Sequence, residues 1–266
     1  MKTTVTRGTV KLRENEMDYF CFGSGKTPFV MLPGLSVKPV IHSAEGVASA
    51  YRLFADDFTV YCFERTKFLN ENYTVEMLAD DTAEAMEALG LSGVCLFGTS
   101  QGGMMAQYIA AKHPSLVKKL LLASTCARLF PAAEAVMGQW IKNAQSGDTE
   151  RFLDDFIDVL YGKAFGEKFG EFIRLAHRDV TDADFERFML LGRSCGVLDT
   201  RALLGQIRCP SLVIGAVNDR VLTAEASLEI AQLLGCPCWF YGAEYGHCVF
   251  DEAPDYKQRI YDFFTQ

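Results

Sequence analysis

The segment Val94-Cys95-Leu96-Phe97-Gly98-Thr99-Ser100-Gln101-Gly102-Gly103 decides how this chain folds. Its first four residues are apolar and predict a buried strand, and a helix-forming segment, 101–112, follows Ser100 without a break. Glycines two residues to either side of Ser100 let the backbone bend sharply without Cβ clashes. Because such a bend exposes the hydroxyl beside a helix N-terminus, the segment predicts Ser100 as a nucleophile. A glycine-rich turn with an incidental serine is the alternative interpretation, since Gly-x-Ser-x-Gly also arises by chance.

Short apolar runs recur along the chain on both sides of this segment. Runs that are apolar on both faces are typical of parallel strands covered by helices. The predicted strands are 29–32, 58–63, 94–97, 119–123, 211–215 and 238–241. Helical periodicity predicts helices over 75–89, 101–112, 224–234 and 250–264, and two further runs, 5–12 and 17–22, predict an N-terminal hairpin. This alternation favours an α/β fold with a mostly parallel, doubly wound sheet.

One stretch, from about 127 to 201, interrupts the alternation of strands and helices. It contains no convincing strand and is rich in aromatic residues at helical spacing, among them Phe130 and Trp140. We therefore expect a helical cap over residues 127–200, inserted into a core that comprises 1–126 and 201–266. The aromatic residues are consistent with an apolar roof over a binding pocket, and plain packing between helices is the alternative for any one of them.

The composition is that of an ordinary globular protein. The chain has 266 residues, 49% of them hydrophobic, which suffices for one α/β domain with an insertion. A formal net charge of −8, without a run of Lys or Arg, argues against nucleic acid and anionic membranes as partners. No apolar stretch reaches the roughly 18 residues that span a bilayer, and no signal-like apolar segment follows Met1. We expect a cytoplasmic protein without membrane insertion.

The nine cysteines are odd in number and scattered, and most of them lie in apolar strands. This pattern predicts reduced thiols that pack as small core residues. The one close pair is Cys236-Pro237-Cys238, with His247 and Cys248 downstream, and its spacing does not match that of a zinc site. We therefore expect neither a metal nor another cofactor.

A nucleophilic serine needs a base, and the chain offers four histidines. His113 precedes a proline at a predicted helix end and is expected to cap that helix. His177 stands among charged residues of the predicted cap and is expected to be solvated. His42 follows Pro33-Gly34 closely and is either a surface residue or part of a pocket. His247 lies in a loop between the last strand and the last helix, where sites form in α/β sheets, and is the predicted base.

The base in turn needs a carboxylate that fixes its tautomer. Asp219 follows the strand at 211–215 and precedes His247 by one strand–helix unit, so both loops open at the same edge of the sheet. Asp199 and Asp251 compete for this role, but Asp199 lies at the exit of the predicted cap and Asp251 opens the last helix. Asp219 is therefore the predicted acid. The order serine, aspartate, histidine along the chain is diagnostic among serine hydrolases.

These motifs together resemble the α/β-hydrolase family, with a short helical cap. Two more segments carry the resemblance: Lys112-His113-Pro114-Ser115-Leu116-Val117 with the strand after it, and Tyr245-Gly246-His247 with Glu252-Ala253-Pro254. The match runs from the strand at Phe29 to the final helix. It implies an α/β-hydrolase fold with a Ser-Asp-His triad at Ser100, Asp219 and His247.

The resemblance also implies an oxyanion hole made of two backbone N–H groups. One belongs to Gln101, the residue after the nucleophile, and the other to Leu35, which follows Pro33-Gly34. The family often has His-Gly where this chain has Pro33-Gly34, so Ser36 is an alternative donor. The loop before Asp219 is also one residue longer than the common Gly-x-x-Asp spacing of the family.

The predicted function is hydrolysis of a small to medium hydrophobic carboxylic ester through an acyl-enzyme. Ser36, His42, Phe130 and Trp140 are the candidates for binding this small-molecule substrate, and a homodimer is possible. The same triad could instead serve C–C bond or lactone hydrolysis or acyl transfer, and the fold could serve a non-catalytic ligand receptor. Haloalkane dehalogenation is disfavoured, because the resemblance would then require an aspartate in place of Ser100.

Overall fold

Eight strands form one sheet in the computed structural model, which describes residues 4–266, in the order β1-β2-β4-β3-β5-β6-β7-β8. β1 pairs with β2 and β2 with β4 in antiparallel fashion, and all pairs from β4 and β3 to β7 and β8 are parallel. The predicted mostly parallel sheet with an N-terminal hairpin is therefore confirmed. The strands are β1 Thr6–Lys11, β2 Glu16–Phe22, β3 Thr27–Leu32, β4 Phe58–Phe63, β5 Val94–Thr99, β6 Val117–Ala123, β7 Ser211–Ala216 and β8 Cys238–Tyr241.

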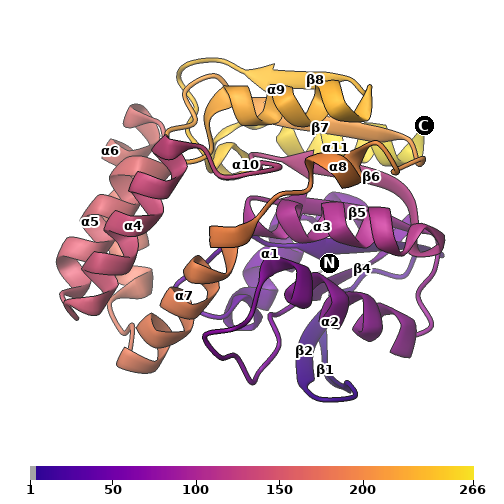
Figure 1. Ribbon diagram of the computed structural model, residues 1–266, viewed down its shortest axis with the longest axis horizontal. Helices are drawn as coiled ribbons and strands as arrows, with labels where there is room; N and C mark the ends of the chain where they lie inside the picture. The colour runs from indigo at the N-terminus through magenta and orange to yellow at the C-terminus, as the bar shows by residue number, and fades with distance from the viewer. Residues whose placement is uncertain (1–3) are drawn as a thin grey trace.

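Helices cover both faces of this sheet (Figure 1). Residues 1–3, which belong to the predicted core, lie outside the described residues. The helices of the two faces are α1 Ala44–Ala50, α2 Val75–Ala88, α3 Gln101–Lys112, α9 Thr223–Leu234, α10 Val249–Glu252 and α11 Tyr256–Thr265. Short 3-10 helices lie at Val40–Ser43, Arg52–Phe54 and Pro114–Leu116, and another, Cys195–Val197, lies between β6 and β7.

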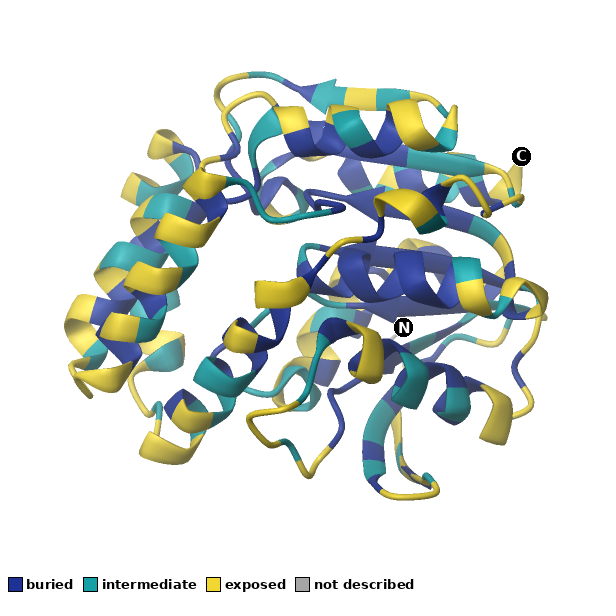
Figure 2. Cartoon of the chain, viewed as in Figure 1, coloured by how far each residue is buried: buried dark blue, intermediate teal, exposed yellow. Residues whose placement is uncertain are grey.

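Alternating side chains of each parallel strand enter two different cores. In β5, Val94 and Leu96 join the cluster beneath α2, α3 and α9, whereas Cys95 and Phe97 join the cluster beneath α1 and α11. All six residues of β5 are buried (Figure 2). A strand with both faces covered can lose apolar surface to water on each side, which is why its sequence is a continuous apolar run rather than an alternating one.

The last helical segment differs from its prediction. The sequence indicated one helix over 250–264, but the structure has two, α10 and α11, separated by Ala253-Pro254-Asp255. Proline lacks the N–H that would continue a helical hydrogen-bond ladder, and it disfavours helical backbone at the residue before it. Ala253 accordingly has extended backbone, with φ −87° and ψ 121°.

Five helices connect β6 to β7: α4 Pro131–Gln145, α5 Thr149–Leu160, α6 Lys163–His177, α7 Asp182–Ser194 and α8 Arg201–Leu204. Figure 1 shows α4 to α7 gathered as a group at one end of the sheet. An isolated antiparallel bridge between Arg128 and Asp199 joins the two ends of this segment. The division into a core and a cap over 127–200 remains a prediction, and below "the insertion" denotes residues 127–200.

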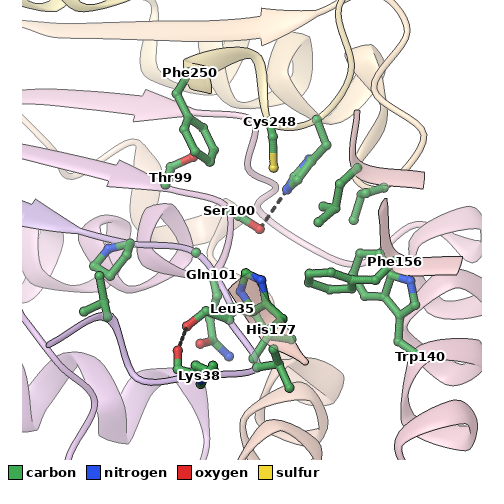
Figure 3. A pocket seen from close by; sticks show the side chains of 18 of the residues that line it. Leu35, Lys38, Thr99, Ser100, Gln101, Trp140, Phe156, His177, Cys248 and Phe250 are labelled. Carbon is green, nitrogen blue, oxygen red and sulfur yellow. Dashed lines mark hydrogen bonds between the residues drawn. The ribbon is translucent and has the colours of Figure 1, made fainter. Parts of the chain in front are cut away.

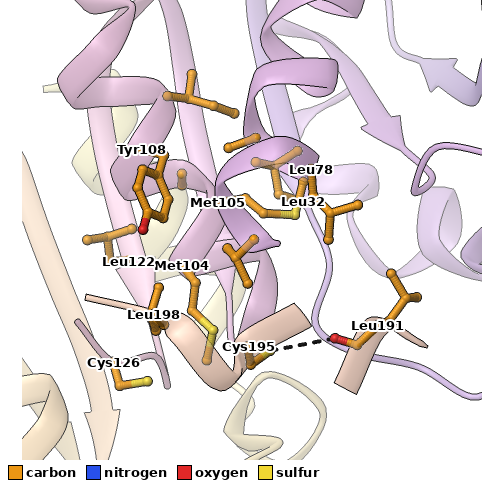
Figure 4. Close-up of a cluster of buried hydrophobic side chains, with 14 of the residues drawn as sticks. Leu32, Leu78, Met104, Met105, Tyr108, Leu122, Cys126, Leu191, Cys195 and Leu198 are labelled. Atoms are coloured by element: carbon orange, nitrogen blue, oxygen red, sulfur yellow. Dashed lines mark hydrogen bonds between the residues drawn. The ribbon is translucent and has the colours of Figure 1, made fainter. Parts of the chain in front are cut away.

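The insertion packs on an aromatic cluster of its own. The Phe152 ring lies 5.1 Å from the rings of both Phe185 and Phe188, and all three side chains are buried. The insertion also reaches the main core, because Leu191 and Cys195 pack with Met104 of α3 in one cluster (Figure 4). Among residues 4–266, no helix has the length and apolar character needed to cross a membrane.

We expect Gly102→Ala to destabilise the protein by at least about 2 kcal/mol, since overpacking a rigid contact has costs of this order. A Cβ at Gly102 would lie 2.0 Å from the carbonyl oxygen of Leu32, so backbone would have to move. Urea unfolding followed by circular dichroism measures the loss.

Gly138→Ala is the matched control, because Gly138 lies inside α4 with nothing within 4 Å of the added Cβ. The control should gain roughly 0.5–1 kcal/mol from helix propensity. Wild-type stability in Gly102→Ala would show that α3 and β3 do not approach each other as closely as the structure has them.

Candidate active site

Ser100 occupies a strained turn between β5 and α3. Its backbone angles are φ 52° and ψ −124°, which few residues other than glycine adopt. The turn is held because the Ser100 N–H donates to the Ala123 carbonyl at 3.0 Å, while the Thr125 hydroxyl donates to the Ser100 carbonyl at 2.7 Å. Gly98 and Gly102 make the turn possible, since a Cβ at Gly98 would lie 2.5 Å from the Gly102 carbonyl oxygen. The sharp turn places the Ser100 hydroxyl at the edge of a cavity (Figure 3).

The structure brings Ser100, His247 and Asp219 into one hydrogen-bonded chain. His247 Nε2 lies 3.0 Å from Ser100 Oγ, and His247 Nδ1 lies 2.8 Å from Asp219 Oδ2. A carboxylate only accepts hydrogen bonds, so Nδ1 carries the proton and Nε2 presents its lone pair to the serine hydroxyl. The other carboxylate oxygen, Oδ1, accepts the N–H groups of Val221 at 2.8 Å and Leu222 at 2.9 Å. This arrangement can remove the proton from the Ser100 hydroxyl.

The surroundings of Asp219 favour its ionised form. Burial alone would raise the pKa of this carboxyl group. The His247 imidazole, by charge and by hydrogen bond, and the N–H groups of Leu222 and Val221 outweigh burial and hold the pKa below its usual range. The carboxylate therefore stays charged beside the imidazole at neutral pH.

The two competing acids lie elsewhere. Asp199 is exposed and pairs with Arg201, and Asp251 accepts from the Tyr161 hydroxyl at 3.2 Å. A neighbouring carboxylate has a role that the sequence did not reveal: Glu252 accepts the N–H groups of Gly246 at 2.9 Å and Gly162 at 3.0 Å. It thereby fixes the loop that carries His247 and joins this loop to the insertion.

A cavity of about 390 Å³ opens beside Ser100 and His247, between the sheet edge and the insertion. The insertion supplies a mostly apolar wall, and Figure 3 shows the rings of Phe156 and Trp140 to one side of Ser100. This wall includes Met137, Trp140, Leu153, Phe156 and Ile173, and Met104 of α3 lines the cavity too. A cavity of this size and character suits a small to medium apolar molecule.

Three of the four predicted substrate-binding residues line this cavity: Ser36, His42 and Trp140. The fourth, Phe130, is not among the lining residues of this cavity. Its ring packs instead under the guanidinium of Arg128, whose central carbon lies 4.1 Å from the ring centroid. Phe130 stands at the N-cap of α4, where the chain enters the insertion, and helical spacing alone does not define which way such a residue faces.

His177 lines the cavity, although the sequence predicted a solvated residue. Its Nδ1 lies 2.9 Å from the Ile173 carbonyl oxygen, which only accepts, so Nδ1 carries a proton and Nε2 is left for other partners. Ile173 lines the cavity too, four residues earlier on the same face of α6. Near the end of α6, Lys38 pairs with Asp179 at 2.5 Å and so links the core to the insertion.

The loop after β3 lies against Ser100. A Cβ at Gly34 would lie 3.0 Å from Ser100 Cβ, and Leu35 and Ser36 follow along the cavity wall. Behind this loop is Arg65, a buried arginine that no sequence motif singled out. Its Nη2 donates to the carbonyl oxygens of Pro33 at 2.6 Å and Gly34 at 3.4 Å, and its Nε donates to the Gln101 side chain at 3.1 Å.

A family model described as the alpha/beta hydrolase fold matches residues 27–170, more than half of the chain. The chain belongs to the alpha/beta hydrolase fold family. The match contains β3 to β6 and α3, and thus Ser100 with the loop of Pro33 and Gly34. The match ends inside the insertion and does not include Asp219 or His247. Their position beside Ser100 rests on the distances given above.

Characterised relatives of this hydrolase-fold chain are distant. The 2-hydroxymuconate semialdehyde hydrolase of Pseudomonas sp. strain CF600 is 21% identical over 228 residues, which cover 83% of this chain and 78% of the relative. The 3-oxoadipate enol-lactonase 2 of Acinetobacter baylyi is also 21% identical, over 82% of this chain and 81% of the relative. At these identities the relatives support a hydrolase of this fold without defining its substrate.

Solved structures agree on the fold over nearly the whole chain. MGS-M2, an alpha/beta hydrolase enzyme from a Medee basin deep-sea metagenome library, superposes with a TM-score of 0.87 at 18% identity, over 97% of this chain and 98% of that one. The enol-lactonase of Burkholderia xenovorans LB400 gives a TM-score of 0.82 at 20% identity, over 97% and 100%. The resemblance inferred from the sequence is therefore confirmed at the level of the fold.

We expect the stability of the wild type relative to Asp219→Asn to fall as the pH decreases from about 5 to about 3. The folded-state pKa of Asp219 lies below its unfolded value, so the stabilisation from the ionised carboxylate is present above the unfolded pKa. It is lost as the pH falls through the folded-state pKa. Urea unfolding of both proteins across this range measures the difference, and a difference independent of pH would contradict the prediction.

Proposed function

We propose that the protein is a serine hydrolase that cleaves carboxylic esters through an acyl-enzyme intermediate. The observation that carries this proposal is the unbroken hydrogen-bonded chain from Ser100 Oγ through His247 to Asp219, next to a mostly apolar cavity. Nucleophile, base and carboxylate in this arrangement recur on several unrelated folds that perform acyl transfer.

In the proposed first half-reaction, Ser100 Oγ attacks the carbonyl carbon of the ester and its proton passes to His247 Nε2. Asp219 stabilises the imidazolium that forms and keeps its orientation. The tetrahedral intermediate then collapses, the C–O bond to the leaving group breaks, and His247 returns the proton to the departing alkoxide. The alcohol leaves, and the acyl group stays on Ser100.

In the second half-reaction, His247 Nε2 takes a proton from water, and the hydroxide attacks the acyl carbon. Collapse of this intermediate breaks the bond to Ser100 Oγ, which regains the proton from His247, and the carboxylic acid is released. The carbonyl oxygen is negatively charged in both tetrahedral intermediates, so both require the same hydrogen-bond donors.

The proposed donors are the backbone N–H groups of Gln101 and Leu35. Gln101 is the first residue of α3, so no carbonyl of its own helix accepts its N–H. Leu35 is favoured over Ser36 because Arg65 Nη2 donates to the carbonyl of the Gly34–Leu35 peptide at 3.4 Å. Within residues 4–266, no hydrogen bond orients the carbonyl of the peptide before Ser36 in this way. A donor with a fixed direction stabilises an oxyanion better than one that has to reorient.

A second candidate is hydrolysis of a lactone or of a C–C bond with the same three residues. It is favoured by the relatives named as an enol-lactonase and as a semialdehyde hydrolase, which match more than four fifths of this chain. The identity of these relatives is low, so they do not displace the ester. The ester remains the first candidate because the cavity wall is mostly apolar. A non-catalytic receptor is disfavoured by the intact hydrogen-bonded chain.

We expect Ser100→Ala to lose at least about 10⁴-fold in kcat with a short-chain p-nitrophenyl ester, because the attacking atom is gone. Labelling by a fluorophosphonate should disappear in the same variant. Steady-state kinetics and mass spectrometry of the labelled protein measure the two effects.

Ser227→Ala is the matched control, since Ser227 is a buried serine in α9 that does not line the cavity. It should keep both labelling and turnover. Labelling that persists in Ser100→Ala, or a folded wild type that is neither labelled nor active on esters and lactones, would refute the proposed function.

Trp140→Ala should shift the preference towards longer acyl chains, because truncation of a buried ring on the cavity wall enlarges the site. We expect the ratio of kcat/KM for octanoate over butyrate p-nitrophenyl esters to rise by about 10-fold. Phe130→Ala is the control, since Phe130 lies outside the cavity, and it should leave the ratio unchanged. Equal ratios in the two variants would contradict the position of the acyl pocket.

A further inference from the structure

We propose that Arg65 is a positioning residue that fixes both amide donors of the oxyanion hole from behind. The inference rests on the proposed serine-hydrolase function. Arg65 is buried and is not among the residues that line the cavity, so it does not contact a substrate there. It acts on the site through the loop of Pro33 and Gly34 and through Gln101.

The first donor is set by peptide geometry. In a trans peptide the C=O and the following N–H point in opposite directions, and the described residues contain no cis peptide. Arg65 Nη2 holds the carbonyls of Pro33 and Gly34 on the buried side of the loop. The N–H groups of Gly34 and Leu35 must therefore point to the opposite side, where the cavity and Ser100 lie.

The second donor is fixed through a side chain. Arg65 Nε donates to Gln101 Oε1 at 3.1 Å, and Gln101 Nε2 in turn donates to the Leu191 carbonyl at 2.7 Å. Both ends of the Gln101 amide are thus used, so the residue is held on two sides while its backbone N–H stays at the start of α3. One guanidinium therefore bonds to the segment of each donor, and its planar fork fixes their relative direction.

The contacts of Arg65 explain why a charge is buried here. Burial, opposed by the neighbouring Glu64 carboxylate, lowers the pKa of Arg65 to about 10, so the side chain is still protonated at neutral pH. Its hydrogen-bond partners are two carbonyl oxygens and an amide oxygen. An apolar side chain of similar volume commonly stabilises a protein as well as a buried charge does. We attribute the buried guanidinium of Arg65 to its directed hydrogen bonds, which fix the orientation of these three acceptor groups.

The same group of side chains reaches the insertion. Glu64 pairs with Arg187 of α7, and Gln101 bonds to Leu191 on the same helix. The backbone N–H of Ile41 also donates to Glu64, at 3.4 Å. The position of α7, which belongs to the insertion over the cavity, is therefore tied to the oxyanion loop.

Three variants test the proposal. Arg65→Met removes the charge and all directed donors, and Arg65→Lys keeps the charge but loses the fork. Gln107→Met is the matched control, because Gln107 is an equally buried polar side chain on α3 that bonds to Gly103 and Cys126 but not to the loop. Active sites are counted by fluorophosphonate labelling carried to completion. Turnover of a short-chain ester, and inhibition by a trifluoromethyl ketone that forms an oxyanionic hemiketal with Ser100, are then expressed per active site.

Arg65→Met should lower kcat per active site by about 100-fold with KM changed less than about threefold, as expected for loss of a donor used in the transition state. The inhibition constant of the ketone should rise by a similar factor, and Arg65→Lys should recover about tenfold of the loss. Gln107→Met should match the wild type per active site.

A purely structural role for Arg65 would lower the number of active sites but leave kcat and ketone affinity per site unchanged, and this result would overturn the proposal. A rise in KM with unchanged kcat would overturn it as well, since it would place Arg65 in ground-state binding. Either result with an active, labelled wild type leaves the proposed function standing. A wild type that is neither labelled nor active would refute both the role proposed for Arg65 and the proposed function.

Discussion

The close approach of the start of α3 to the ends of β3 and β5 is the constraint on which the rest of the structure depends. Only glycine fits at 98 and 102, because an added Cβ would meet backbone at 2.5 and 2.0 Å. This contact forces Ser100 into its strained conformation and leaves its hydroxyl facing the cavity. Strain of this kind persists only where the surroundings determine it fully. The hydrogen bonds of the Ser100 backbone to the Ala123 carbonyl and the Thr125 hydroxyl, together with a buried strand, do so here.

Around this turn two buried charged side chains, Asp219 and Arg65, are held by directed hydrogen bonds. Asp219 accepts from His247 and from two backbone N–H groups, and Arg65 donates to three oxygens of the oxyanion loop and Gln101. In a dry environment each of these bonds is stronger than in water, and each would be costly to leave unmade. The network therefore fixes orientation at the same place where the proposed reaction develops charge.

The sequence predicted most of the sheet and the hydrogen-bonded chain because these depend on local patterns and on chain order. Strands that are buried on both faces are visible in the sequence as apolar runs. His247 follows Asp219 by one strand–helix unit, so chain order brings the two to the same edge of the sheet. Three features escaped prediction for physical reasons: His177 and Phe130 depend on how helices of the insertion are rotated about their axes, and Arg65 is 32 residues from its partner Pro33. The break before Pro254 could have been read from the proline itself.

The pairing of Lys38 with Asp179 is more exposed than that of Glu64 with Arg187, and both pairs join the core to the insertion. The Asp179 side chain is 72% exposed, so dissolved ions screen this pair, whereas Glu64 and Arg187, at 10% and 19%, are shielded from them. The tip of α6 is therefore fastened to the core by an interaction that ionic strength weakens, while α7 keeps its attachment. Salt therefore acts unequally on these two links: it weakens the contact beside His177, which lines the cavity, and leaves the contact of α7 in place.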